Sequence, residues 1–245
     1  MKVIRLKEVD STNRYLHDCQ QLPDGQSVLV VADYQTAGRG QGSNTWESEP
    51  GKNLLFSLAI QPKFVPVRRQ FLLAEAEALA IKEALDSYTD GITLKWPNDV
   101  YWQDRKISGT LIETSLSAGA VKRCVFGTGI DVNQREFYSD APNPVSLYQI
   151  LGHEVPLDEL LQKVVNGITA NLELLAEDQF ADISTRYHAA LYRRTGYHKY
   201  QDAEGMFEAA LVEVEDDGHL VLHDRQGLIR RYAFKEVTFV LEEYK

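Results

Sequence analysis

Residues 92–130, ITLKWPNDVYWQDRKISGTLIETSLSAGAVKRCVFGTGI, decide the fold class of this 245-residue chain. They contain several runs rich in β-branched and aromatic residues, and no helical periodicity separates one run from the next. Consecutive strands of this kind argue against the strict strand–helix alternation of a doubly wound fold. We predict strands at residues 92–96, 100–102, 107–115 and 121–130, with a hairpin tip at residues 103–105.

The segments before and after this block add helices and three more strands. Short apolar runs predict strands at residues 2–6, 27–32 and 53–60. Helical periodicity predicts a helix from Ser11 to about Gln20, another over residues 67–88, and two or three helices between residues 144 and 191. We therefore expect an α+β domain over residues 1–194, in which a mixed, largely antiparallel sheet packs against helices.

The character of the sequence changes after about residue 195. Short alternating segments follow one another and are separated by glycine-containing turns, which is typical of a small β-barrel of about 50 residues. The predicted strands are residues 207–214, 220–222, 229–234 and 237–241. Residues 195–245 are therefore predicted to form a separate, small C-terminal β domain.

The charge of the chain limits its partners. The 26 Lys and Arg residues and 36 Asp and Glu residues give a formal net charge of −10. Neutralisation of phosphates supplies most of the affinity of general nucleic-acid binders, so we expect no DNA partner. A local cationic pocket for a nucleotide remains compatible with this charge.

Hydropathy and cysteine content favour a cytoplasmic protein. No stretch approaches the ~20 consecutive apolar residues of a membrane helix, and charges interrupt the apolar residues at the N-terminus, unlike in a secretory signal. Cys19 and Cys124 are the only cysteines and lack metal-ligand spacing, which favours incidental thiols in a reducing compartment over a disulfide. We expect no membrane partner.

The polar segment QTAGRGQGSNTW, residues 35–46, contains three glycines within five residues, with Arg39 among them. Glycines tolerate positive φ and leave backbone N–H groups free to converge on phosphate oxygens. The guanidinium of Arg39 suits a phosphate or a carboxylate, and Trp46 offers a stacking face for a base. The segment fits neither the P-loop nor the dinucleotide-binding glycine pattern, and a plain surface loop is the alternative.

Residues 95–99, KWPND, place a cation, an indole, an amide and a carboxylate next to one another. Pro97 favours an extended Trp96, so that the side chains fan out from a strand end. Asn98 and Asp99 offer oxygens that suit a magnesium ion shared with substrate phosphates. A turn with a solvated lysine is the alternative.

Three weaker signals accompany these segments. Lys106 begins a strand, where an edge charge is the ordinary explanation. Gly109 within that strand indicates close approach of a ligand or another backbone, and Gly127 near the end of the next strand has the same two interpretations. Residues 11–13, Ser-Thr-Asn, either cap a helix or face a small polar ligand.

Taken together, these segments resemble the biotin–protein ligase family. The matching motifs are DSTN (10–13), QTAGRG (35–40) with Trp46, KWPND (95–99), KISG (106–109) and GTGIDVN (127–133). The resemblance covers nearly the whole chain, and the pairing of GRG with KWPND is highly specific. It implies a class II synthetase-like catalytic domain followed by a small SH3-like barrel.

The resemblance implies an enzyme that uses ATP and Mg²⁺ to activate biotin as biotinyl-5′-AMP, which then acylates a specific lysine of a biotin carboxyl carrier protein. It implies a catalytic set of Arg39, Lys95, Asp99 and Lys106. It implies a biotin pocket formed by Ser11, Thr12, Asn13, Gln35, Gly38, Arg39, Gly40, Gln41, Lys106, Gly109 and Gly127. It implies an ATP site formed by Arg39, Trp46, Asn98, Asp99, Lys106 and Asp131, with Asp99 on the magnesium side.

The implied reaction agrees with the chemistry of these side chains. It brings two anions together, so cations and backbone donors must offset their repulsion, and Arg39, Lys95 and Lys106 are suitable. The biotin carboxylate is already ionised at neutral pH, so activation needs no general base. The attacking lysine amine of the second step must lose a proton, for which Asp99 and the phosphate are the candidate acceptors.

The sequence departs from the family pattern in three places. Gln41 stands where a second arginine is usual, Ser43 replaces a later glycine of the loop, and Asp131 stands where asparagine is common. Without the second arginine, retention of biotinyl-AMP rests more heavily on Arg39 and Lys106. Only one strand precedes residue 10, so we expect the short form without an N-terminal DNA-binding domain and without a repressor role.

Two other functions fit parts of the sequence. A lipoate or octanoate ligase shares the superfamily fold, although KWPND and GRG favour biotin. A catalytically silent biotin- or nucleotide-binding module is the other alternative; the intact set of basic and acidic residues argues against it, whereas Gln41 favours it. The oligomeric state is open, a homodimer included.

Overall fold

The computed structural model describes residues 1–18, 25–42, 44–117, 119–139 and 141–241. Cys19 and Gln20, at the end of the first predicted helix, and Ser43 lie outside the described residues. Among the helices of the described ranges, none has both the length and the apolar character needed to cross a membrane.

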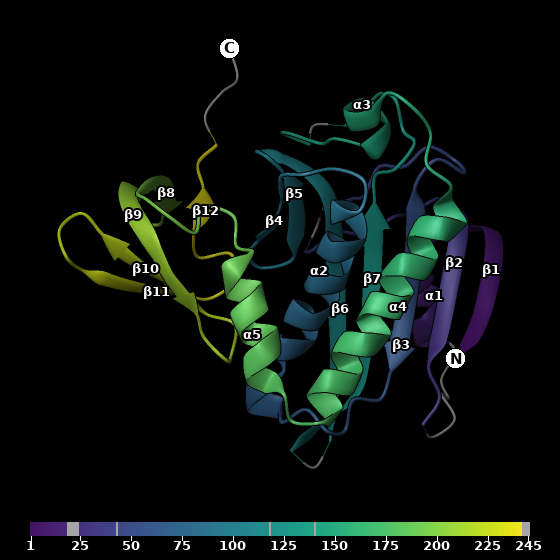
Figure 1. Cartoon of the computed structure of the whole chain (residues 1–245), viewed down its shortest axis with the longest axis horizontal. Coiled ribbons are helices and arrows are strands. Elements are labelled where there is room, and N and C mark those ends of the chain that lie inside the picture. The colour runs from purple at the N-terminus through teal and green to yellow at the C-terminus, as the bar shows by residue number, and fades with distance from the viewer. Residues whose placement is uncertain (19–24, 43, 118, 140, 242–245) are drawn as a thin grey trace.

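A seven-stranded mixed sheet forms the central layer of the molecule (Figure 1). Its strands are β1 (Lys2–Val9), β2 (Val28–Gln35), β3 (Leu54–Ile60), β4 (Ile92–Lys95), β5 (Asp99–Trp102), β6 (Arg105–Ser117) and β7 (Ala120–Ile130). The spatial order is β1-β2-β3-β7-β6-β5-β4; β1 and β2 are parallel, and all other neighbours are antiparallel. The predicted α+β class with a largely antiparallel sheet is confirmed.

Helices cover both faces of this sheet, as Figure 1 shows. Helices α2 (Phe71–Asp86) and α4 (Leu157–Ala176) lie together on one face, and α5 (Phe180–Ala189) packs beside α2. Gly167 of α4 allows this close approach, since an added Cβ would lie 3.0 Å from the Cβ of Ala80. The opposite face carries α1 (Thr12–Asp18), whose Leu16 is fully buried against β2, β3 and β7.

The remaining predicted helices differ from the structure in detail. The helix expected over residues 67–88 is a short 3-10 turn, η1 (Val67–Arg69), followed by α2. The region from residue 144 to 191 holds three helices, because α3 (Leu147–Leu151) precedes α4 and α5. Ser146 begins α3 with a capping box, in which the Ser146 and Gln149 side chains accept from each other's backbone N–H.

Successive side chains along β6 and β7 point to opposite faces of the sheet. Thr110 and Thr128 are register partners and both hydroxyls donate to Glu77 of α2, at 2.8 Å and 2.7 Å. The adjacent pair, Gly109 and Gly129, therefore faces the other side of the sheet, where α1 lies. This opposite face carries the functional site described below.

The C-terminal residues form a second, five-stranded antiparallel sheet. Its strands are β8 (His198–Asp202), β9 (Gly205–Val214), β10 (Leu220–Asp224), β11 (Ile229–Tyr232) and β12 (Thr238–Phe239), in the order β11-β10-β9-β8-β12. The sheet fits the expected SH3-like domain, but its described strands do not close into a barrel. The sequence prediction also omitted β8, because Tyr200 is the only buried side chain in that strand.

One buried apolar cluster connects the two sheets. It includes Leu94 of the main sheet, Leu191 after α5, and Tyr200 and Phe239 of the C-terminal sheet. Trp96 adds a polar link, since its Nε1 donates to the carbonyl of Gly218 at 2.9 Å. The predicted boundary at residue 194 thus falls between two parts that share a core.

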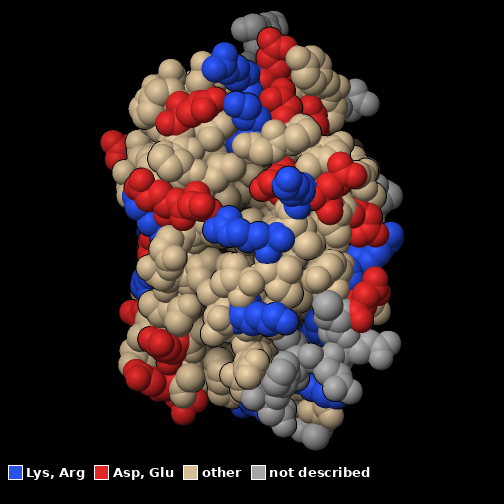
Figure 2. Space-filling model, turned by 90° about the vertical axis from the view of Figure 1, so that its right-hand side faces the viewer, with Lys and Arg blue, Asp and Glu red and all other residues tan. Residues whose placement is uncertain are grey.

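The face that carries β1 bears both signs of charge. Figure 2 shows short rows of Lys and Arg across the middle of this face, with Asp and Glu on both sides. Two exposed ion pairs involve residues of β1, α1 and the turn between them, Arg5 with Asp158 at 2.7 Å and Arg14 with Asp10 at 2.7 Å. Exposed pairs of this kind are worth at most about 1 kcal/mol each, so they contribute little to the stability of the fold.

Candidate active site

A cavity of about 880 Å³ is lined by both sheets and by the loop that follows β2. It brings together almost every residue predicted for the site, although these come from distant parts of the chain. The predicted residues that line it are Ser11, Thr12, Asn13, Gln35, Arg39, Gly40, Gln41, Trp46, Lys95, Asn98, Asp99, Lys106, Gly109, Gly127 and Asp131. Gly38 does not line the cavity; it lies at the base of the loop, where an added Cβ would be 2.7 Å from the carbonyl oxygen of Trp46.

Glycines of β6 and β7 form the floor of the cavity. A Cβ added at Gly129 would overlap the indole of Trp46, and one added at Gly109 would lie 3.2 Å from the same ring. A Cβ added at Gly127 would overlap the carboxamide of Asn13. The close approach expected at Gly109 and Gly127 is therefore made by side chains of this chain.

The glycine-rich segment is a small hairpin over this floor. Arg39 and Thr45 form an antiparallel bridge, Gly40 N donates to the carbonyl of Asn44 at 2.8 Å, and Trp46 N donates to that of Gly38 at 3.1 Å. Gly42 near the tip has φ of 68°, a conformation that favours glycine. We call residues 38–42 and 44–46 the lid hairpin.

A polar network joins α1 to β2, β3 and β6 at one end of the cavity. Gln35 Oε1 accepts from the backbone N and the hydroxyl of Thr12, at 2.8 Å and 3.0 Å. Ser57 Oγ lies 2.7 Å from Thr12 Oγ1 and 2.5 Å from Asn13 Oδ1. Asn13 Nδ2 donates to Glu113 Oε2 at 2.9 Å. Ser11, Thr12 and Asn13 all line the cavity at this end.

Ser57 and Glu113 were missed by the sequence analysis. Ser57 is a single hydroxyl within β3, whose other residues are all buried and apolar, and this is a signal that could have identified it. Glu113 lies among the polar residues of the outer half of β6, so its position beside Asn13 depends on tertiary structure alone.

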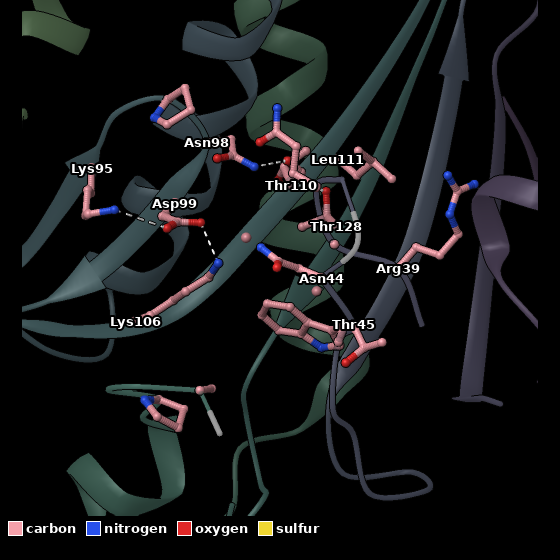
Figure 3. A pocket seen from close by; sticks show the side chains of 18 of the residues that line it. Arg39, Asn44, Thr45, Lys95, Asn98, Asp99, Lys106, Thr110, Leu111 and Thr128 are labelled. Carbon is pink, nitrogen blue, oxygen red and sulfur yellow. Dashed lines mark hydrogen bonds and ion pairs between the residues drawn. The ribbon is translucent and has the colours of Figure 1, made fainter. Parts of the chain in front are cut away.

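Asp99 lies between two lysines at the other end of the cavity. Its Oδ1 is 2.5 Å from Lys106 Nζ, and its Oδ2 is 3.5 Å from Lys95 Nζ (Figure 3). Lys106 Nζ also lies 5.6 Å from the centre of the Trp46 ring, and Lys95 Nζ lies 5.0 Å from that of Phe239. The three charged groups leave one net positive charge at this end.

Arg39 lies on the opposite side of the cavity from this group, as Figure 3 shows. Its Nη1 is 4.0 Å from Glu113 Oε1, and its side chain is about half exposed. Arg39 and Lys106 therefore lie on opposite sides of the cavity.

Asp131 lies at the end of β7 and is almost completely buried. Burial raises the pKa of its carboxyl well above the usual range, in spite of the nearby positive charge of Lys106. Its Oδ1 accepts from Asn53 Nδ2 at 3.2 Å.

Asn98 does not offer its whole side chain to a ligand. Its side-chain Nδ2 donates to the backbone carbonyl of Thr110 at 2.6 Å. The backbone carbonyl of Asn98 accepts from Thr110 N at 3.0 Å. Asn98 thereby fixes the turn between β4 and β5 against β6. The Trp96–Pro97 peptide in this turn is cis, whereas the sequence analysis considered only an extended Trp96.

Asp99, the residue predicted on the magnesium side, is held by two lysines. Both oxygens of Asp99 already face ammonium groups, so coordination there would displace a lysine. Within the described ranges, the three acidic or histidine side chains close enough to share an ion lie elsewhere, on the hairpin between β9 and β10. These are Glu215, Asp217 and His219.

The C-terminal sheet also lines the cavity, which the sequence analysis did not anticipate. The ring of Phe234 lies 6.3 Å from that of Trp96, so the turn before β12 contacts the KWPND segment directly. The lining residues from this part are Phe234, Lys235, Val237, Thr238, Phe239 and Leu241.

The fold and this cavity define the class of the protein. Residues 6–131 match the Biotin/lipoate A/B protein ligase family model, and the chain belongs to this family. The computed structure is similar to that of the biotin protein ligase from Aquifex aeolicus in complex with biotin and ATP. The two share 32% sequence identity and a TM-score of 0.81, and the match covers 98% of this chain and 99% of the other.

The chain is also similar in sequence to proteins named as biotin ligases. The bifunctional ligase/repressor BirA of Bacillus subtilis is 28% identical over 92% of this chain and 70% of its own length. The biotin–[acetyl-CoA-carboxylase] ligase of Paracoccus denitrificans is 29% identical over 91% of this chain and 94% of its own length. The sequence-based identification with the biotin–protein ligases is confirmed.

Proposed function

We propose that the chain activates biotin with ATP to form biotinyl-5′-AMP and then transfers biotin to a lysine of a biotin carboxyl carrier protein. The observation that carries the proposal is the layout of the cavity. The cavity runs from polar groups at residues 11–13 and Gln35, over a glycine floor, to the cationic group around Lys106. This layout suits an acid whose polar head binds at one end and whose carboxylate reaches a nucleotide phosphate at the other.

The first step joins two anions. A biotin carboxylate oxygen attacks the α-phosphorus of ATP, a P–O bond forms, and the bond to the β-phosphate breaks with release of pyrophosphate. Lys106 and Arg39 lie on opposite sides of the cavity and would flank the reacting groups. Fixed cations of this kind lower the barrier because they need no reorganisation as charge moves.

The second step transfers the acyl group. The lysine amine of the carrier attacks the carbonyl carbon of biotinyl-5′-AMP, the C–O bond to the phosphate breaks, and AMP leaves. The amine must lose a proton, and both oxygens of Asp99 face lysine ammonium groups. This occupation favours the departing phosphate over Asp99 as the proton acceptor.

Trp46 and Asp131 line the space we assign to the adenosine. The Trp46 Nε1 is buried without a hydrogen-bond partner among the described residues, so a ligand acceptor can satisfy it. Asn98 and Asp99 complete this side of the cavity. Magnesium enters as the companion of ATP, where it would neutralise phosphate charge, and the phosphates rather than Asp99 would hold it.

The direct test is incubation with ATP, Mg²⁺, biotin and a purified carrier domain, followed by an avidin-type blot. We expect biotin on the carrier lysine only when ATP is present. A parallel reaction with lipoate and octanoate decides between biotin and the other acids of the superfamily. A folded chain that leaves the carrier unmodified by biotin would contradict the proposal.

Gly127→Ala is expected to weaken biotin binding about tenfold, with a smaller effect on the KM for ATP. The added Cβ would overlap the Asn13 carboxamide, so Asn13 must give up its position beside Ser57 and Glu113. Calorimetric titration with biotin measures the effect. An unchanged dissociation constant would show that biotin does not bind against Asn13.

A further inference from the structure

We propose that Lys235 of the C-terminal sheet binds the phosphates of the nucleotide and supplies the cation that Gln41 does not provide. This inference deepens the proposed function and rests on it. It assigns to the C-terminal sheet a direct part in the adenylation site. Its basis is the contact between Lys235 and the tip of the lid hairpin.

The tip of the lid hairpin meets the C-terminal sheet at Lys235. A Cβ added at Gly42 would overlap Lys235 Nζ, so the ammonium group lies against the backbone of the tip. Gln41, the neighbouring residue, lines the same cavity and leaves its Oε1 buried without a partner among the described residues. The position of the missing arginine and the Lys235 ammonium therefore lie at the same edge of the cavity.

Lys235 differs from the other cations of the cavity in its pairing. No carboxylate within the described ranges forms an ion pair with Lys235, although the side chain is exposed and lines the cavity. Its positive charge is therefore available to an incoming anion. The other three cations each face a carboxylate: Arg39 faces Glu113, and Lys95 and Lys106 face Asp99.

The backbone holds Lys235 in a conformation that few lysines adopt. Its φ is 71°, in the left-handed region that non-glycine residues rarely adopt. The turn is closed by Glu236, whose N donates to the Ala233 carbonyl at 3.2 Å and whose carboxylate accepts from Ala233 N at 2.7 Å. Phe234 packs against Trp96, so the turn is fixed relative to the KWPND segment.

Charge balance shows why a fourth cation matters. ATP brings several negative charges, and the ion pairs with Glu113 and Asp99 leave little free positive charge around the cavity. A lysine at the lid tip neutralises phosphate charge and holds the hairpin closed over the nucleotide in the same contact. An arginine at position 41 would do both from the hairpin itself.

Lys235→Ala is expected to weaken binding of α,β-methylene-ATP about tenfold in the presence of saturating biotin, as measured by calorimetry. The affinity for biotin alone should stay unchanged. Lys235→Arg should bind the analogue nearly as well as the wild type. Lys199→Ala, on the exposed face of β8, is the matched control and should have no effect.

The decisive variant combines Lys235→Ala with Gln41→Arg. A cation restored from the hairpin should recover most of the lost affinity, which a merely structural role of Lys235 would not produce. An unchanged affinity in Lys235→Ala would overturn the proposal, as would a loss that neither arginine variant restores. If the wild type binds the analogue but does not activate biotin, the proposed function fails while these titrations still decide the role of Lys235.

Discussion

Replacing Lys106 by alanine is expected to reduce biotin-dependent release of pyrophosphate about a thousandfold or more. Lys106 Nζ lies 2.5 Å from Asp99 Oδ1 and close to the Trp46 ring, at the place where we expect carboxylate and α-phosphate to meet. The substitution removes a cation and also leaves the Asp99 carboxylate facing two incoming anions with Lys95 alone beside it. Both effects raise the barrier to activation.

A coupled pyrophosphate assay with biotin and ATP measures this effect. Adding Asp99→Asn to Lys106→Ala removes the uncompensated carboxylate, so the double variant should regain roughly tenfold of the lost rate. Lys122→Ala, exposed on β7, is the matched control and should react as the wild type does. Near-normal release from a folded Lys106→Ala variant would remove Lys106 from the site.

The strands and the motifs of the site could be predicted because the sequence encodes them locally. Residues 92–130 carry the strand signals of β4 to β7 with turn residues between them, and the structure has these strands within a few residues of the prediction. The KWPND and GRG segments have unusual compositions, so they stand out without knowledge of their neighbours. In the structure, Arg39 and Lys106 line the same cavity.

The rest of the site depends on tertiary contacts that no local pattern records. Glu113 becomes a site residue only because β6 passes beside α1, and Lys235 only because the C-terminal sheet packs against the KWPND turn. The same limit applies to Asp99, because its ion pair with Lys106 depends on the pairing of β5 with β6. For charged side chains such as these, the neighbouring groups in the folded chain determine the chemistry, and the residue type alone does not.

A second strong effect arises behind the floor of the cavity, where α2 places Glu77 against the sheet. Glu77 is almost completely buried, and its Oε1 accepts from Thr110 and Thr128, the register pair next to Gly109 and Gly129. Burial raises the pKa of Glu77 to about 7, although the two hydroxyl donors lower it in part. The carboxyl is therefore protonated in the folded chain at mildly acidic pH.

The sign of the resulting pH dependence follows from proton binding. Between the unfolded pKa of 4.5 and the folded pKa of about 7, the folded chain holds a proton on Glu77 that the unfolded chain has released. The free energy of unfolding therefore falls as the pH rises through this window, by about 3 kcal/mol in all. Glu75 on the same helix adds to this trend, because burial and the charge of Asp216 raise its pKa to about 8.

Glu77→Gln is expected to make the chain more stable than the wild type at high pH. The amide keeps the shape of the protonated carboxyl and an oxygen that accepts from both threonines, but it never ionises. Its advantage in the free energy of unfolding should grow by about 2 to 3 kcal/mol between pH 5 and pH 8, as urea denaturation at the two pH values would show. The exposed Glu173→Gln on α4 is the matched control and should leave the pH dependence unchanged. An equal advantage of Glu77→Gln at both pH values would mean that the pKa of Glu77 in the folded chain is not raised. The carboxyl below the cavity floor would then be ionised at neutral pH.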